Sequence, residues 1–253
     1  MTTRIIAAGS NALNAAEVLH VVRRIVGGSI FLRTMISSKL TGAEDTDLYV
    51  CAVTHKEKML SIVPPGSLSV LDLRPTAEFF IALSHIPAGE TVYIFNSNDR
   101  MAHMLADMCQ EYHIHALHFE TIAYEDMPQQ EVIEKLQKAR YIIGIGRIVD
   151  KDVLLSPQYA PYLREDVTII GCMRMATMET ACELIENVAA IEGSSFDADR
   201  LQQQLLNTLA GQFSDTLHAV DGLSPFSNSK TLTSMLKQLE EIISRSQSIS
   251  HRK

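Results

Sequence analysis

Two polar loops, each directly after an apolar run, carry the residues of this sequence best suited to bind a ligand. The stretch AAGSN contains Ser10 and Asn11, and the later stretch IFNSN contains Ser97 and Asn98. In open α/β sheets, ligands bind beyond the carboxyl ends of strands, beside helix N-termini whose N–H groups favour anions. Ser and Asn more commonly serve there only as helix caps, and both roles stay open. If the loops face each other, they form two sides of one binding cleft.

Two arginines follow the last apolar strand of each half of the chain. Arg74 follows VLDL and Arg174 follows IIGCM. A guanidinium group can hold a carboxylate or phosphate through two parallel hydrogen bonds, so the pair could clamp a dianion. The alternative is an ordinary ion pair with Glu78, Glu179 or Asp72.

Three further polar residues end the preceding strands and could line the same cleft. They are Thr54 and His55 in the first half and Arg147 in the second. The complete predicted ligand-binding set is Ser10, Asn11, Thr54, His55, Arg74, Thr76, Ser97, Asn98, Arg147 and Arg174. We expect no catalytic residues among them, because no convincing pair of nucleophile and base is present.

The nucleotide-binding motifs that depend on glycine are missing from both loops. Gly9 stands alone and IFNSN has no glycine, so neither loop has the G-x-G-x-x-G of dinucleotide-binding folds. The chain also lacks G-x-x-x-x-G-K-[ST], which excludes nucleotide hydrolysis through a P-loop. We expect no cofactor.

The four cysteines are scattered without the spacing of a disulfide framework or a zinc site. Cys51 and Cys172, one in each half, suggest the two-cysteine proton transfer of amino-acid racemases, but their neighbours lack the CNT and GCTH motifs of those enzymes. A metal site is likewise not expected. Its candidate ligands would be Cys109, His113, His115 and His118, and only part of that set could converge from one strand.

Apolar strand patterns alternate with amphipathic helix patterns up to about residue 192, which predicts an α/β fold with parallel sheets. In the first half, strands are expected at 4–8, 30–36, 47–53 and 68–73, and helices at 14–26 and 76–86. In the second half, strands are expected at 91–95, 114–121, 140–146 and 166–172, and helices at 100–112, 129–139 and 176–191.

The two halves share one order of elements, which favours duplication of a single unit. RIIAAGSN overlays on TVYIFNSN, DLYVCAV on RYIIGIG, and LSVLDLRPTAE on TIIGCMRMATME with one insertion that pairs Arg74 with Arg174. We therefore predict a first lobe at 1–88, whose closing helix is free to cross over, and a second lobe at 89–192. A single continuous sheet is the alternative.

Residues 193–253 change character, with Gln, Ser, Asn and Leu replacing β-branched residues. Apolar residues recur there at helical spacing at Leu201, Leu205, Leu209, Phe213 and Leu217, and again at Leu232, Leu236, Leu239 and Ile243. The pattern predicts two helices that pack on the body or mediate a homodimer.

Composition excludes several classes of partner. The net charge of −8 argues against a nucleic-acid surface on this chain, because phosphate binding requires clustered Lys and Arg. No apolar run approaches the length of a membrane span, and no leader is recognisable, so we expect a cytoplasmic protein without membrane contact.

The segments DLYVCAVTHKEKMLSIVPPGSLSVLDLRPT and IPAGETVYIFNSNDRMAHMLADMCQEYHI resemble the ligand-sensing domains of bacterial enhancer-binding activators, in particular the sensor of the propionate-catabolism activator. The resemblance covers residues 1–192 and rests on VPPG and PAG turns that precede strands. It implies two flavodoxin-like lobes with an effector between them, attached to an output domain. The chain departs from the full pattern because it has neither an ATPase domain with a P-loop nor a helix-turn-helix.

From these observations we expect a sensing module of a transcriptional regulator that binds a small anionic metabolite between its lobes. One alternative is an isomerase, racemase or lyase that acts on a small carboxylate in the same cleft. Another is a purely structural dimerising protein, in which the residues of the cleft loops could be substituted without effect.

Overall fold

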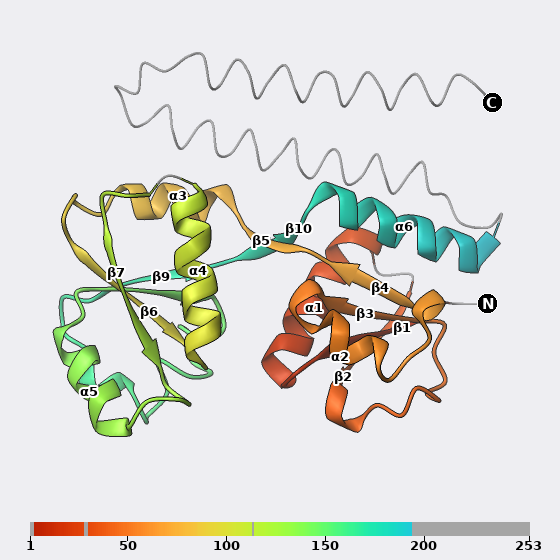
Figure 1. Ribbon diagram of the computed structural model, residues 1–253, viewed down its shortest axis with the longest axis horizontal. Helices are drawn as coiled ribbons and strands as arrows, with labels where there is room; N and C mark the ends of the chain where they lie inside the picture. Colours follow the sequence, from red (N-terminus) through yellow and green to blue (C-terminus); the bar gives the residue numbers. More distant parts are fainter. Residues whose placement is uncertain (1–2, 28–29, 113, 194–253) are drawn as a thin grey trace, which may run out of the picture. The chain divides into compact units, whose positions relative to one another are not determined.

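The computed structural model describes residues 3–27, 30–112 and 114–193. Figure 1 shows two parallel sheets of four strands with helices packed on them. The predicted α/β class with two parallel sheets is therefore confirmed. The helices expected after residue 193 lie outside the described residues.

The first sheet has the strand order β2-β1-β3-β4. Its strands are β1 (Arg4–Gly9), β2 (Phe31–Ile36), β3 (Leu48–Ala52) and β4 (Leu68–Leu71). Ile5 and Ile6 on β1 are fully buried, as expected for a central strand of a parallel sheet covered on both faces.

The second sheet repeats this arrangement with the order β7-β6-β8-β9. Its strands are β6 (Thr91–Asn96), β7 (His118–Ala123), β8 (Tyr141–Ile145) and β9 (Thr168–Cys172). In both sheets the first strand of the unit lies between the second and the third, which is the beginning of the flavodoxin-like order. The overlay of the two halves thus matches strands that occupy equivalent places.

Helices connect the parallel strands. The six α-helices of the described chain are α1 (Ala12–Val26), α2 (Lys56–Leu60), α3 (Ala77–Ser84), α4 (Asp99–Glu111), α5 (Gln129–Lys138) and α6 (Met178–Glu192). The buried residues Val18, Val21, Val22 and Ile25 of α1 form the apolar face that the sequence pattern predicts. None of the described helices is long and apolar enough to cross a membrane.

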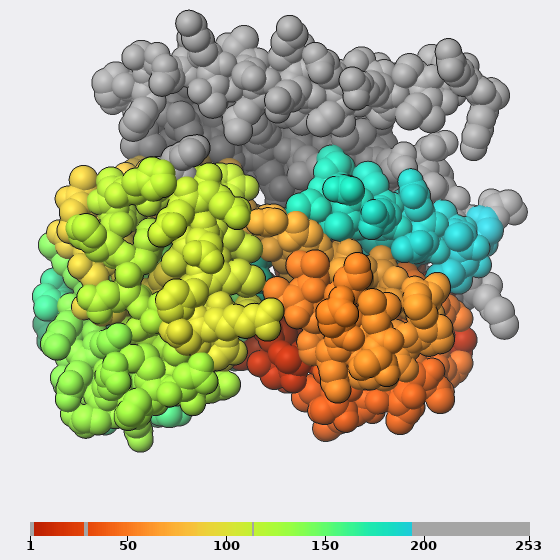
Figure 2. Space-filling view, viewed as in Figure 1, coloured from red at the N-terminus to blue at the C-terminus, as the bar shows by residue number. Residues whose placement is uncertain are grey.

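The last helix of each half packs on the other half's sheet (Figure 1). Phe79 and Leu83 of α3 join the core of the second sheet, where they cluster with Ile94. Conversely, α6 contacts β4, and the Asn187 amide donates a hydrogen bond to Ser69 Oγ at 3.3 Å. Figure 2 shows the blue-green atoms of α6 against the orange atoms of the first half. Each half therefore contributes one helix that packs on the sheet of the other half.

The two crossing segments pair with each other. β5 (Leu73–Pro75) and β10 (Arg174–Ala176) form a two-stranded antiparallel sheet between the parallel sheets. The Thr76 backbone N–H donates to Met173 O at 3.0 Å and extends this contact. Two paired antiparallel strands thus connect the halves.

Candidate functional site

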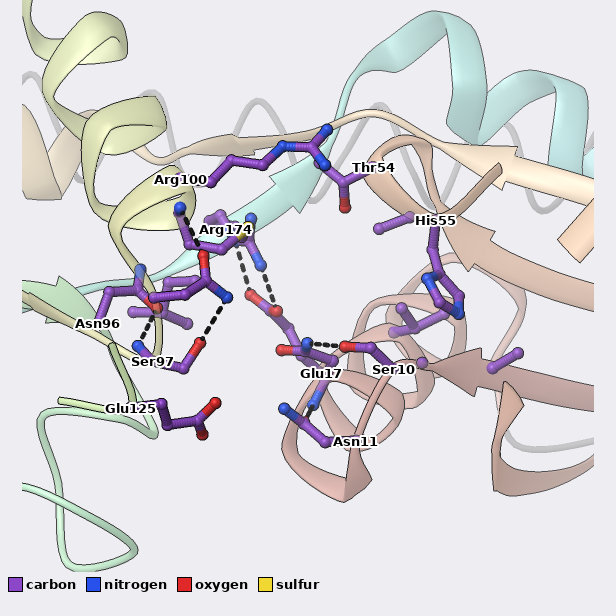
Figure 3. A pocket seen from close by; sticks show the side chains of 18 residues that line it. Ser10, Asn11, Glu17, Thr54, His55, Asn96, Ser97, Arg100, Glu125 and Arg174 are labelled. Carbon is purple, nitrogen blue, oxygen red and sulfur yellow. Dashed lines mark hydrogen bonds and ion pairs between the residues drawn. The ribbon is translucent and has the colours of Figure 1, made fainter. Parts of the chain in front are cut away.

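A cavity of about 470 Å³ is lined by residues that follow strands of both sheets. Its lining includes both Ser-Asn loops, which therefore face one space as the sequence suggested (Figure 3). The predicted site residues that line it are Ser10, Asn11, Thr54, His55, Ser97, Asn98 and Arg174. Their binding of a ligand stays a prediction.

The first loop ends β1 and begins α1. Asn11 caps the helix, because its Oδ1 accepts a hydrogen bond from Asn14 N at 2.9 Å. The Asn14 amide in turn donates to Ser10 Oγ at 2.7 Å. A Cβ on Gly9 would lie 2.3 Å from Ala15 N, so only glycine lets the helix start this close to the strand.

The second loop has the same design. Asn98 caps α4 by accepting from Met101 N at 2.9 Å, and its amide donates to Ser97 Oγ at 3.3 Å. In both loops the serine oxygen accepts from an asparagine, which leaves the hydroxyl hydrogen for another acceptor. The capping role is confirmed in both halves, and two hydroxyl donors remain at the cavity.

Two polar groups at the cavity are buried without a hydrogen-bond partner in the described chain. Asn96 is 1% exposed; its Oδ1 accepts from Ser97 N at 2.8 Å, whereas its Nδ2 has no partner. The Nε2 of His55 has none either. Burial, with a smaller contribution from Lys58, lowers the pKa of His55 below 6.5, so the imidazole is neutral at pH 7. Buried polar groups left unpaired are costly, which makes them candidate ligand contacts.

Arg174 is held by a buried ion pair. Its Nε lies 2.8 Å from Glu17 Oε1 and its Nη2 lies 2.5 Å from Glu17 Oε2. The two side chains are 6% and 14% exposed. Burial opposes the positive charge, but the Glu17 carboxylate outweighs it and raises the pKa of Arg174. The expected pairing of Arg174 with Glu179 is wrong. The Arg174 side chain on β10 pairs with Glu17 of α1 and not with a residue of α6, the helix that follows β10 in the chain.

Arg74 does not line the cavity, which corrects its place in the predicted set. It is 40% exposed and pairs with Asp72 at 3.0 Å and Glu111 at 3.4 Å. The ion-pair alternative with Asp72 is the one that the geometry supports.

The overlay that matched the two arginines is wrong by one residue. β5 begins at Leu73 and β10 begins at Arg174, so Arg174 corresponds to Leu73. Within the two-stranded sheet Arg74 stands opposite Met175, and successive side chains of a strand point to opposite faces. The two arginines therefore lie on opposite faces of the connection.

Two more predicted residues lie outside this cavity. Thr76 precedes α3 as its N-cap residue without a side-chain capping bond. Arg147 pairs with Asp152 at 3.2 Å and lines a neighbouring cavity of about 520 Å³. Glu17 and Arg174 line both cavities, so their ion pair stands at the boundary between the two spaces.

Several cavity residues were missed by the sequence argument. Arg100 in the first turn of α4 and Glu125 after β7 both line the cavity and are exposed. In Figure 3, Arg100 extends toward Thr54 and the Glu125 carboxylate points into the open space. Glu17 was missed as well. The available signal for Arg100 was its place two residues after the capping Asn98.

The cysteines offer no reactive group at the cavity. Cys51 does not line it, and burial raises the pKa values of Cys51 and Cys172 to about 12. A thiolate is the reactive form of cysteine, and at neutral pH both groups are thiols. Within the described residues, no group of three His, Cys, Asp or Glu side chains could hold a metal ion; His113 lies outside them.

Comparison of the chain with protein-family models, with curated proteins and with solved structures finds no match. The resemblance to activator sensor domains therefore stays a prediction.

Proposed function

We propose that this protein is a sensing module that binds a small metabolite with an anionic group in the cavity between its two halves, as part of a transcriptional regulator. The observation that carries this proposal is the convergence of both Ser-Asn loops on one cavity of about 470 Å³. That volume lies in the usual range of small-molecule sites. The position beyond the carboxyl ends of parallel strands is where such folds bind ligands.

The hydrogen-bonding groups at the cavity favour an anion. The hydroxyls of Ser10 and Ser97 each accept from a neighbouring asparagine and retain a hydrogen to donate. The buried Asn96 amide adds an unpaired donor. The N-termini of α1 and α4 contribute the positive ends of two helix dipoles.

The connection between the halves supports a sensing role. A ligand that contacts both lobes stabilises the arrangement of the lobes that binds it more tightly. The size of this stabilisation is set by the difference between the ligand's affinities for the two arrangements. The paired strands β5 and β10 and the exchanged helices α3 and α6 would transmit such a change. Because α6 leads into residues 193–253, the ligand could control the placement of that segment and its pairing with a partner subunit or output domain.

The enzymatic alternative, an isomerase, racemase or lyase, has less support. A cysteine-based proton transfer requires accessible thiolates on either side of the substrate, and the pKa values of Cys51 and Cys172 near 12 oppose this.

The proposal is tested by a thermal-shift screen of the full chain against small carboxylates, sugar phosphates and nucleotides. A ligand present at 100 times its Kd is expected to stabilise the protein by about 2.7 kcal/mol. Ser97→Ala should weaken binding of the hit severalfold, while Ser61→Ala, which removes an exposed hydroxyl outside the cavity, should not. The proposal fails if no compound stabilises the chain, or if both variants respond like the parent.

A further inference from the structure

The strand β2 is the most exposed strand of the two parallel sheets. None of its residues is buried, whereas each of the other strands of these sheets has at least one buried residue. Its first residue, Phe31, is 57% exposed. β2 also ends the strand order of its sheet, so one of its edges pairs with no other strand of the described chain. Exposed apolar edge strands are sites at which another chain can pair.

The equivalent strand of the second half, β7, has more cover. Both α4 and α5 contact it, and α5 lies between β7 and β8 in the chain. Between β2 and β3 there is no α-helix but only a 3₁₀ turn, Ser37–Lys39. Because parallel sheets normally have both faces covered, the lack of a helix equivalent to α5 accounts for the exposure of β2.

The two edge strands also differ at one pair of equivalent threonines. The register of each strand on its neighbour matches Thr34 of β2 with Thr121 of β7. The Thr121 carbonyl accepts from Lys135 Nζ at 3.0 Å, and the Thr121 hydroxyl donates to Asp99 Oδ1 at 3.0 Å. Within the described residues, no side chain bonds to the carbonyl or the hydroxyl of Thr34. The edge of β7 is thus occupied where the edge of β2 is open.

The backbone direction of β2 shows which residues face the open edge. The Phe31 N–H donates to Thr3 O at 2.9 Å and therefore points toward β1. Backbone groups of successive residues in a strand point in opposite directions, so those of Leu32, Thr34 and Ile36 point away from β1. These three residues present N–H and C=O groups at the spacing that another strand requires.

We propose that two copies of this chain pair through β2, antiparallel about a twofold axis that passes through Thr34. Thr34 then faces its own copy, and Leu32 faces Ile36 of the partner subunit, which places one apolar pair on each side of the axis. Arg33 is the only charged residue of β2, and an axis through Arg33 would place two positive charges directly opposite each other. The strand is therefore complementary to itself in one register.

The first test is the dimer Kd of the full chain, measured by sedimentation equilibrium. The parent should form dimers of the 28.1 kDa chain. Thr34→Lys places like charges opposite each other at the axis and should raise the Kd at least about tenfold. Thr34→Val keeps a β-branched residue and should leave the Kd unchanged. The matched control is Thr168→Lys, at an exposed position on the edge strand β9, and it should also have the parent Kd.

The second test is cross-linking, which does not depend on how Thr34→Lys folds. Residues directly opposite each other in a hydrogen-bonded antiparallel pair have Cα atoms about 5.5 Å apart, within reach of a disulfide. Mild oxidation of Thr34→Cys with copper phenanthroline should therefore give a covalent dimer. Arg33→Cys, whose neighbour across the axis is Met35 of the partner subunit, should give little, and the parent chain is the blank.

The outcomes separate this interface from the other proposals. A parent chain that stays monomeric, a parent Kd in Thr34→Lys, or no cross-link in Thr34→Cys would overturn the pairing of β2. A dimer with an unchanged Kd in Thr34→Lys would mean that the chain pairs elsewhere. Since no residue of β2 lines the cavity, Thr34→Lys should keep any ligand-induced stabilisation of the parent, and failure of this interface leaves the proposed function intact.

Discussion

The two halves of the molecule share a backbone plan but differ in the side chains that they present to the cavity. Extending the overlay of β1 on β6 matches Gly9 with Asn96 and Leu13 with Arg100. The first half has an apolar residue where the second has an unpaired cation. Both loops have the same asparagine caps and serines, whereas the exposed charged residues Arg100 and Glu125 at the cavity belong to the second half.

The connecting strands show a similar divergence. Arg174 is buried against Glu17 of the first half, while Arg74 lies at the surface beside Asp72 and Glu111. Two arginines that look alike in the sequence therefore have different energetic roles. Substitutions at the buried arginine should therefore change stability more than substitutions at the exposed one.

The largest loss of stability is expected from breaking the buried pair. Glu17→Gln leaves the Arg174 guanidinium buried without a countercharge, which typically costs roughly 3 kcal/mol. Urea denaturation of the parent and the variant measures this directly. The double variant Glu17→Leu and Arg174→Met should recover most of the loss, because a buried ion pair can be replaced by apolar side chains. A single variant as stable as the parent would contradict the burial described for this pair.

A smaller effect distinguishes the two loops. Gly9→Ala places a Cβ 2.3 Å from the backbone of α1, and the strain should cost about 2 kcal/mol. Asn96→Ala at the matching position removes one hydrogen bond to Ser97 N and should cost about 1 kcal/mol. Thermal denaturation of both variants tests the order; equal losses would show that the loops do not differ in this way.

Arg74→Ala should lower the free energy of unfolding by less than about 1 kcal/mol, because exposed ion pairs contribute little. It should also leave ligand-induced stabilisation unchanged, since Arg74 does not line the cavity. A thermal-shift measurement with and without the ligand gives both values. Loss of the ligand response in this variant would restore Arg74 to the site.

The smallest effect is a dependence of stability on pH. The pKa of His55 is lowered in the folded protein, so the unfolded chain takes up a proton first as the pH falls. The stabilising contribution of neutral His55 is present above about pH 6.5 and is lost as the pH falls through the folded-state pKa. Urea denaturation at a series of pH values should show a smaller fall in stability on acidification for His55→Gln than for the parent chain. Equal slopes for the variant and the parent would refute this role.

Much of the fold could be predicted from the sequence. Buried strands appear as short apolar runs and amphipathic helices as apolar residues three or four positions apart, and the two halves contain these patterns in the same order. The convergence of Ser10 and Ser97 followed from the same logic, since ligand sites lie beyond the carboxyl ends of parallel strands. The role of Arg74 could not be predicted in this way. A shift of one residue in a strand moves a side chain to the opposite face, and the overlay carried that error.

The remaining site residues depended on contacts that sequence spacing does not reveal. The Glu17–Arg174 pair joins residues 157 positions apart, through a strand that crosses between the halves. Arg100 and Glu125 look like ordinary exposed charges until the fold places both at one cavity. The packing of α3 on the second sheet and of α6 on the first also depends on how the chain crosses between the halves, which the spacing of residues does not reveal.

The most direct test of a single site formed by both halves is a double-mutant cycle on the two serines. The affinity of the best ligand from the thermal-shift screen is measured by calorimetry for the parent, Ser10→Ala, Ser97→Ala and the double variant. If one ligand bridges the loops, each single variant should weaken binding severalfold while the fold stays intact. If only one of the two serines affects the affinity, the ligand binds to one half alone, and the proposed site between the halves is wrong.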